Sequence, residues 1–206
     1  MTVKIDYFFT SLSPWAYFGH DAARALAAKH GATLIPRPVN LGDMFSVSGQ
    51  VPVVQRAPVR QRYRQIELQR FAHYRGKPIN LQPAHFPTDP TLADHTVCAI
   101  VAAGGDPLDY MGEVFAAVWA NEQQIADEAT LARLLSAAGF DAGAILAKAK
   151  EPETAAMRAK NTADAIAVDA SGVPCFVLDG EPFWGQDRLD ILDHALATGR
   201  PPFKPL

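Results

Sequence analysis

The segment that most restricts the fold is a hairpin sequence near the end of the 206-residue chain. Residues 171–178 form an apolar run that is entered through Val173-Pro174, and residues 181–185 form a second run. Between the two runs stands Asp179-Gly180, a pair typical of a two-residue β-turn. The sequence therefore predicts two antiparallel strands. Pro182 places the second strand at a sheet edge, because proline has no N–H to donate to a neighbour.

The first forty residues predict a second unit of the same sheet. Apolar residues alternate there as in a strand, at Val3, Ile5, Tyr7 and Phe9. A helix is expected from Pro14 to about residue 30, followed by a strand over residues 32–39. A last helix is expected to begin at Gln186-Asp187 and to end at Gly199. A chain that begins β-α-β and ends β-β-α has the element order of a thioredoxin-like domain.

The middle of the chain predicts a helical insertion. The fold class is therefore α/β, with a thioredoxin-like domain formed by residues 1–40 and 172–206 and an inserted all-helical domain over residues 41–171. Capping and periodicity signals predict helices over residues 59–75, 91–103, 106–121, 127–138, 142–149 and 152–170. Glycines and prolines predict a loop over residues 40–58, and four prolines predict an extended loop over residues 77–90.

The helix predicted over residues 59–75 has two contrasting faces. The apolar face carries Val59, Tyr63, Ile66 and Tyr74. The basic face carries Arg60, Arg62, Arg64 and Arg70, and Arg56 precedes the helix. The basic face is either an ordinary solvated surface or a surface that attracts an anionic substrate.

Composition argues against several kinds of partner. The formal net charge is −3, so neither nucleic acid nor an anionic membrane is expected. No apolar run approaches the roughly 20 residues of a membrane span. The chain starts directly with a strand pattern, so no signal peptide and a cytoplasmic location are expected. Cys98 and Cys175 are too far apart to suggest a disulfide framework, and the histidines lack metal-ligand spacing, so no metal is expected.

The start of the first helix is a candidate site for an anion. Pro14 suits the first helical position, which makes Ser13 the N-cap residue. The free amides of Trp15 and Ala16, together with the helix dipole, favour a thiolate or a carboxylate there. The alternative is that Ser13 is only a cap. A Ser-His-Asp triad is not favoured, because the sequence has no nucleophile elbow.

Four segments of the chain resemble one enzyme family. They are Ser13-Pro14-Trp15, Ser48-Gly49-Gln50, Gly172-Val173-Pro174 and the Phe-Trp-Gly-Gln-Asp-Arg-Leu sequence of residues 183–189. The chain resembles 2-hydroxychromene-2-carboxylate isomerases, which belong with the kappa-class glutathione transferases among DsbA-like proteins. The resemblance extends over nearly the whole chain. It implies a cytoplasmic homodimer that uses glutathione as cofactor and acts on a small aromatic carboxylate.

The resemblance also implies a reaction and its catalytic residue. The reaction is glutathione-dependent isomerisation of 2-hydroxychromene-2-carboxylate to trans-o-hydroxybenzylidenepyruvate. The glutathione thiolate would add to the conjugated system of the ring-opened form, the former double bond would rotate, and glutathione would leave. Ser13 would donate a hydrogen bond to the glutathione sulfur and so favour the thiolate.

The resemblance further implies two sets of binding residues. Glutathione contacts are expected from Ser13, Pro14, Trp15, Gln50, Val173, Pro174, Gln186 and Asp187. Substrate contacts are expected from His85 and Phe86, which match a substrate-facing segment of the family. Arg56, or nearby Gln55, is expected to hold the substrate carboxylate in place of a family residue that this chain lacks. The Val173 backbone would pair with the extended tripeptide, and Asp187 would accept from its ammonium group unless it is a plain N-cap. Gln50 stands where the family has asparagine, and Val51 stands where the family often has a basic residue.

Other functions remain open at this stage. A kappa-like transferase would use the same site, and so would a non-catalytic glutathione or peptide binder. A disulfide oxidoreductase is disfavoured, because Ser13 and Ala16 stand where such enzymes carry cysteines. Cys175 follows a Val173–Pro174 bond that is expected to be cis; its strand position favours a buried, inert thiol over a redox-active one. Trp119, Tyr110 and Phe115 are expected in the core.

Overall fold

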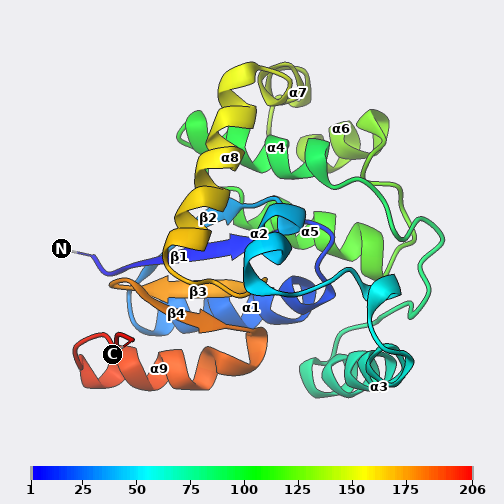
Figure 1. Cartoon of the computed structure of the whole chain (residues 1–206). Helices are drawn as coiled ribbons and strands as arrows, with labels where there is room; N and C mark the ends of the chain where they lie inside the picture. Colours follow the sequence, from blue (N-terminus) through cyan, green and yellow to red (C-terminus); the bar gives the residue numbers. More distant parts are fainter. Residues whose placement is uncertain (1, 206) are drawn as a thin grey trace.

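A mixed β-sheet lies at the centre of the computed structural model, which describes residues 2–205 (Figure 1). The strand β1 (Lys4–Phe9) lies between β2 (Thr33–Pro38), which is parallel to it, and β3 (Cys175–Leu178), which is antiparallel. The strand β4 (Glu181–Trp184) pairs with β3 and completes the order β2-β1-β3-β4. Segments from the two ends of the chain therefore form one sheet, as the sequence predicts.

The hairpin between β3 and β4 has the predicted geometry. Asp179 and Gly180 both have positive φ angles, of 50° and 85°, as a type I′ turn requires. β4 is an edge strand, so Pro182 leaves no strand neighbour without a hydrogen bond. The predicted edge position of Pro182 is confirmed.

Helices cover both faces of the sheet (Figure 1). α1 (Pro14–Lys29) and α9 (Leu189–Thr198) lie on one face, and α2 (Leu41–Ser48) and α8 (Pro152–Ala167) lie on the other. Side chains of β1 alternate between the two faces, as the period of a strand requires. Tyr7 and Phe9 belong to the cluster around α1, whereas Phe8 packs with Met44 and Ala165 of the opposite layer.

The remaining helices follow α2 in chain order. They are the 3₁₀ turn η1 (Val53–Gln55), α3 (Pro58–Arg75), α4 (Thr91–Ala102), α5 (Leu108–Trp119), α6 (Glu128–Ala137) and α7 (Ala142–Ala149), and a second 3₁₀ turn η2 (Gln186–Arg188) precedes α9. The predicted helices are confirmed to within a few residues. Residues 77–90 contain no helix or strand, which confirms the predicted loop. Within residues 2–205, no helix is both long and apolar enough to cross a membrane.

The helix α2 corrects the prediction of a loop over residues 40–58. The Asn40 side chain accepts a hydrogen bond from the Gly42 amide at 3.0 Å, and Gly49 ends the helix with a φ angle of 69°. Asparagine and glycine therefore act here as helix caps, although the same residues also favour loops. The helix has only eight residues, so its apolar period is short, and Met44 alone is fully buried.

The apolar face predicted for α3 is wrong. Val59, Tyr63, Ile66 and Tyr74 are all exposed. Leu68 is fully buried instead, and Phe71 and Ala72 are partly buried against the core. The packed strip therefore lies in the second half of α3.

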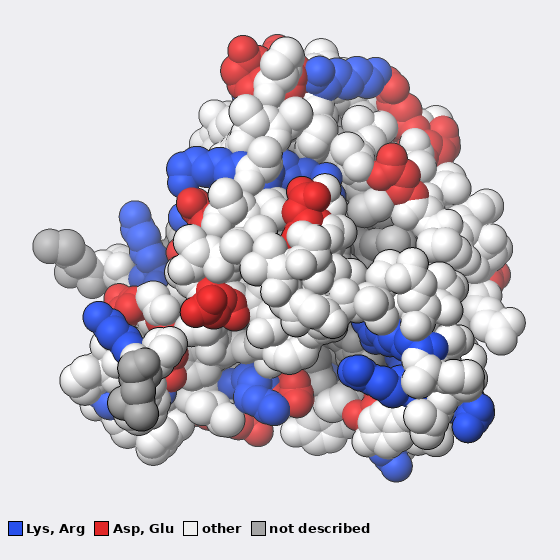
Figure 2. Space-filling model, in the orientation of Figure 1, with Lys and Arg blue, Asp and Glu red and all other residues white. Residues whose placement is uncertain are grey.

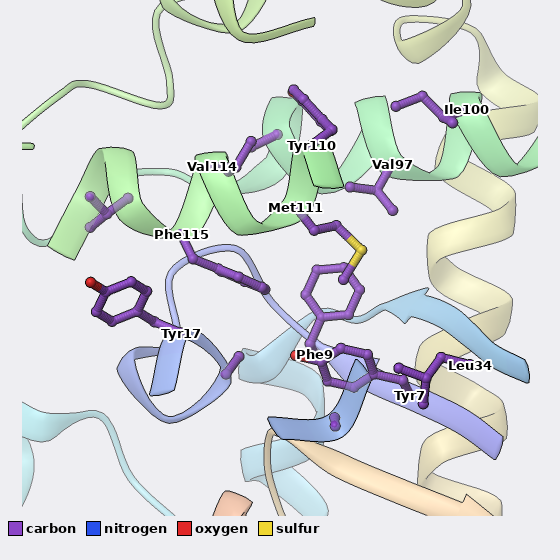
Figure 3. Packing of buried hydrophobic residues seen from close by; sticks show 14 of the residues in the cluster. Tyr7, Phe9, Tyr17, Leu34, Val97, Ile100, Tyr110, Met111, Val114 and Phe115 are labelled. Atoms are coloured by element: carbon purple, nitrogen blue, oxygen red, sulfur yellow. The ribbon is translucent and has the colours of Figure 1, made fainter. Parts of the chain in front are cut away.

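One cluster of buried aromatic side chains joins the sheet to the inserted helices (Figure 3). Phe9 of β1 meets the edge of Phe115 of α5 with 5.6 Å between ring centroids, and Tyr7 stacks on Phe176 at 4.9 Å. Phe115, Tyr110 and Trp119 are fully buried, as predicted. The hydrophobic core therefore fixes the inserted helices relative to the end of β1, after which α1 begins.

Candidate active site

The first turn of α1 has the predicted cap. Ser13 has an extended backbone, and its Oγ accepts a hydrogen bond from the Ala16 amide at 3.2 Å. Pro14 occupies the first helical position, where no N–H is needed. A serine hydroxyl that accepts one hydrogen bond still has its own proton to donate. Ser13 can therefore cap the helix and donate to a bound sulfur at the same time.

A buried carboxylate holds the turn that leads to Ser13. Asp94 of α4 is fully buried and accepts hydrogen bonds from Thr10 Oγ1 at 3.0 Å and from the Ser11 amide at 2.8 Å. Arg158 of α8 donates to the same carboxylate at 2.8 Å and to the Val39 carbonyl at 3.1 Å. Burial raises the pKa of the Asp94 carboxyl, and Arg158 and Ser11 oppose this shift. Two inserted helices therefore position the start of α1.

The loop before β3 lies against the α1 start and contains the expected cis bond. The Val173–Pro174 peptide is cis, which confirms the prediction. The Gln50 side-chain amide donates to the Ser171 carbonyl at 3.1 Å. Gln50, which follows α2 in the chain, therefore holds this loop in place. Within residues 2–205, neither the amide nor the carbonyl of Val173 takes part in a hydrogen bond. Both groups are available to an extended peptide-like ligand.

The segment after β4 forms another wall of the same region. Gly185 has a φ angle of 107°, and a Cβ at this position would collide with the Asp187 carboxylate. The Asp187 carboxylate is half-exposed and pairs with Arg188 at 2.6 Å. Gln186 is buried, and its side-chain oxygen accepts from Arg75 Nε at 3.0 Å and Nη2 at 2.8 Å. Gln186 thus anchors the end of α3, which leaves its side-chain NH₂ group as the part able to face a ligand.

These segments enclose one cavity of about 510 Å³ between α3 and the sheet domain. Trp15 from the α1 start, Val173 from the cis-proline loop and residues 184–188 line one side. The other side is formed by Arg56 and by one face of α3, with Val59, Arg60, Tyr63, Arg64, Glu67 and Phe71. Trp15 and Phe71, one from each side, pack edge to face with 5.9 Å between ring centroids. The volume of the cavity suits a small-molecule ligand, for which about 300–1,000 Å³ is usual.

The electrostatics of this cavity are dominated by arginine. Lys and Arg side chains gather over α3, at lower right in Figure 2. Among residues 2–205, Arg56, Arg60 and Arg64 form no ion pair, whereas Glu67 is paired with Arg70. Burial and, secondarily, the charge of Arg56 lower the pKa of Arg64 to about 10. Burial and Arg60 likewise lower the pKa of Arg56. Unpaired, partly desolvated cations favour the binding of an anion.

The structure brings together some of the predicted site residues but not all. Trp15, Arg56, Val173, Gln186 and Asp187 line the cavity. Ser13, Pro14, Gln50 and Pro174 do not line it. Ser13 and Pro14 precede Trp15 in the chain, Pro174 follows Val173, and Gln50 donates to the loop that carries Val173. Gln55 and His85 are exposed and do not line the cavity. Phe86 lies beneath the Arg64 guanidinium, with 5.8 Å between the guanidinium carbon and the ring centroid.

Sequence reasoning missed several wall residues. Glu67 and Phe71 follow Arg60 and Arg64 of the predicted basic face at helical spacing, which could have shown that the four share a face of α3. Trp184 is half-exposed and covers Gly172, where a Cβ would lie 2.9 Å from the indole nitrogen. Trp184 ends β4 and Gly172 lies in the loop before β3, so their contact depends on the pairing of these two strands. No local sequence signal reveals it.

The cysteines lie outside the chemistry of this site. Cys175 is fully buried, and burial raises the pKa of its thiol to about 12. Cys98 of α4 is also buried, with its pKa raised to about 12. The prediction of a buried thiol at Cys175 is confirmed, and neither thiol is a ready nucleophile at neutral pH.

The fold and the cis-proline site define a class of protein. The sequence profile described as DSBA-like thioredoxin domain matches residues 4–197. The chain belongs to the DsbA-like family of thioredoxin-fold proteins.

Within this class the chain is similar to 2-hydroxychromene-2-carboxylate isomerases. It is 25% identical to such an isomerase from Sphingobium xenophagum, with 95% of this chain and 99% of the relative aligned. It is 28% identical to one from Pseudomonas putida, with 93% of each chain aligned. A solved structure of 2-hydroxychromene-2-carboxylate isomerase superposes with a TM-score of 0.80 at 25% identity, covering 95% of both chains.

Proposed function

We propose that this protein is a glutathione-dependent isomerase that converts 2-hydroxychromene-2-carboxylate-type aromatic compounds to trans-o-hydroxybenzylidenepyruvate-type products. The observation that carries the proposal is a cavity lined by Trp15 of the α1 start, by Val173 of the cis-proline loop and by three arginines that form no ion pair within residues 2–205. Relatives that are similar over nearly the whole chain are named 2-hydroxychromene-2-carboxylate isomerases. The first two features suit a thiol-containing peptide, and the arginines suit a carboxylate substrate.

The residues present fit glutathione, a small anionic tripeptide. The Val173 amide and carbonyl form no hydrogen bond with residues 2–205, so both could pair with the tripeptide backbone. Asp187 at the cavity wall offers a carboxylate to the ammonium group of the tripeptide, in competition with Arg188. Ser13 stands at the N-terminus of α1, where a hydroxyl proton and the helix dipole both favour a negative sulfur.

The protein's own residues would then have separate tasks. Bound glutathione would supply a thiolate that adds reversibly to the conjugated substrate and so permits rotation about the former double bond. Ser13 and the helix start would lower the pKa of the thiol. Trp15 and Trp184 would enclose the reacting groups and exclude water, and the arginines of α3 would hold the carboxylate in register.

The competing disulfide chemistry is not favoured by this site. Ser13 and Ala16 occupy the α1 turn, so no cysteine is present at the helix start. Cys98 and Cys175 are buried with raised pKa values. A thiol in this cavity must therefore come from a ligand.

Binding of reduced glutathione, followed by thermal unfolding, tests this proposal. At a glutathione concentration about 100-fold above its dissociation constant, linkage predicts about 2.7 kcal/mol of stabilisation. S-Methylglutathione is the control, since it keeps the peptide contacts and removes the thiolate; it should stabilise the protein less. The same preparation should convert 2-hydroxychromene-2-carboxylate, followed by its change in absorbance. No shift in melting temperature with several millimolar glutathione, or no turnover, would overturn the proposal.

A further inference from the structure

The wall of the cavity contains an arginine that forms no ion pair with the described residues of the chain. Elsewhere in residues 2–205, three half-buried or buried arginines meet carboxylates: Arg37 pairs with Asp6, Arg158 with Asp94, and Arg200 with Glu181. Arg75 is also half-buried, and its guanidinium is satisfied by the Gln186 side-chain and backbone oxygens. Arg64 is half-buried in the cavity wall, and no carboxylate of residues 2–205 lies within ion-pair distance of it. Leaving a desolvated charge unpaired is costly, so such a residue points to an anionic ligand.

Two aromatic rings lie close to the Arg64 guanidinium group. The guanidinium carbon lies 5.8 Å from the ring centroid of Phe86 and 5.8 Å from that of Trp119. Phe86 and Trp119 themselves pack together with 5.0 Å between centroids. Aromatic faces bind the flat side of a guanidinium and leave its in-plane N–H groups for a bidentate oxygen ligand. The group is therefore held in place before any ligand arrives.

The other two arginines of the wall are less suited to this task. Arg56 already donates its Nε to the Val51 carbonyl at 3.0 Å, which removes one edge of its guanidinium from bidentate use. Arg60 is exposed, so water competes with any anion there. Arg64 alone of the three combines burial, aromatic support and a free guanidinium.

We propose that Arg64 is the carboxylate-binding and specificity-determining residue of this cavity, selecting planar aromatic monocarboxylates over their neutral analogues. This inference rests on the proposed function for the identity of the site, and it moves the expected carboxylate contact from Arg56 to Arg64. The aromatic part of the ligand would lie among Trp15, Tyr63, Phe71 and Trp184, which line the same space. The cation thus orients the carboxylate end, and the rings accept the flat body.

The test uses isothermal titration calorimetry without glutathione and without turnover. The probes are trans-2-hydroxycinnamate and its amide, which share a ring and differ in charge. Arg64→Gln should weaken binding of the carboxylate at least tenfold and change binding of the amide less than twofold. Arg64→Lys keeps the charge but not the bidentate geometry, so an intermediate loss is expected. Arg62→Gln removes an equal charge from the same helix outside the cavity and should change binding less than twofold.

Several results would overturn the assignment. One is failure of the wild-type protein to bind the carboxylate at millimolar concentration. Another is a loss of carboxylate affinity in Arg62→Gln equal to that in Arg64→Gln, or a larger loss in Arg56→Gln. A third is an equal loss of carboxylate and amide affinity in Arg64→Gln. Unchanged binding of the amide shows that the variant cavity is intact. If the carboxylate binds through Arg64 while no chromene carboxylate is converted, the subsite stands and the isomerase proposal fails. If conversion occurs and Arg64→Gln leaves KM unchanged, the subsite fails alone.

Discussion

Asp94 offers a sharp test of how the inserted helices support the site. Its carboxylate is fully buried and accepts three hydrogen bonds, from Thr10, Ser11 and Arg158. Asp94→Ala leaves the Arg158 charge without its partner, and breaking one side of a buried pair costs about 3–5 kcal/mol. A folded domain is stable by only about 5–15 kcal/mol, so urea unfolding followed by circular dichroism should show a large loss.

Asp109→Ala is the matched control for this variant. Asp109 also pairs with an arginine, Arg24, but its side chain is 84% exposed. Its loss should cost less than about 1 kcal/mol. Adding Arg158→Met to Asp94→Ala removes the uncompensated charge and should recover part of the stability, while Thr10 and Ser11 remain unsatisfied at about 1–3 kcal/mol per buried group. If Asp94→Ala costs no more than Asp109→Ala, the buried pair does not hold the turn before α1.

Two further predictions concern α1 itself. Ser13→Ala should lose about 1 kcal/mol of stability with the cap, and it should also raise the pKa of bound glutathione, measured by thiolate absorbance, and reduce turnover. Asp141→Ala is the control, because it removes a similar cap from α7, where Oδ1 accepts from the Ala144 amide at 3.0 Å. This variant should lose stability but keep its activity. If both variants are equally active, Ser13 is only a cap. His20 is buried against Tyr7 and Phe115, and burial lowers its pKa from 6.5 to about 4. As the pH falls, the unfolded chain protonates this histidine near pH 6.5, whereas the folded chain does so only near pH 4. The contribution of neutral His20 to the free energy of unfolding is therefore fully present above pH 6.5 and should fall by up to about 3 kcal/mol towards pH 4. His20→Gln should flatten that part of the curve in urea titrations, and an unchanged slope would refute the assignment.

The elements with strong local signals were predictable from the sequence. Asp179-Gly180 determines its turn through backbone preferences of those two residues, and Pro182 restricts β4 to an edge. Ser13-Pro14 is a helix start for reasons of local hydrogen bonding alone. α2 was missed because Asn40 and Gly49 have the same local chemistry in caps and in loops, and only burial of Met44 decides between them.

The cavity was only partly predictable, because its walls depend on tertiary contacts. The basic residues of α3 were recognised, but their division into a cavity side and a solvent side depends on how Leu68, Phe71 and Arg75 dock the helix. Val59 and Tyr63 were predicted on a separate apolar face, yet they are exposed and share the cavity wall with Arg60 and Arg64. Asp94 gave no signal at all, since its partners at Thr10 and Arg158 lie 84 and 64 residues away in the chain.

The most direct test of the central proposal is titration of free thiol during turnover. An isomerase returns its glutathione, whereas a transferase consumes one thiol for each product formed. With 2-hydroxychromene-2-carboxylate in large excess over a trace of glutathione, we expect many turnovers and no loss of free thiol. Thiol loss in step with product would show a conjugating transferase instead, and the absence of turnover would contradict the isomerase proposal altogether.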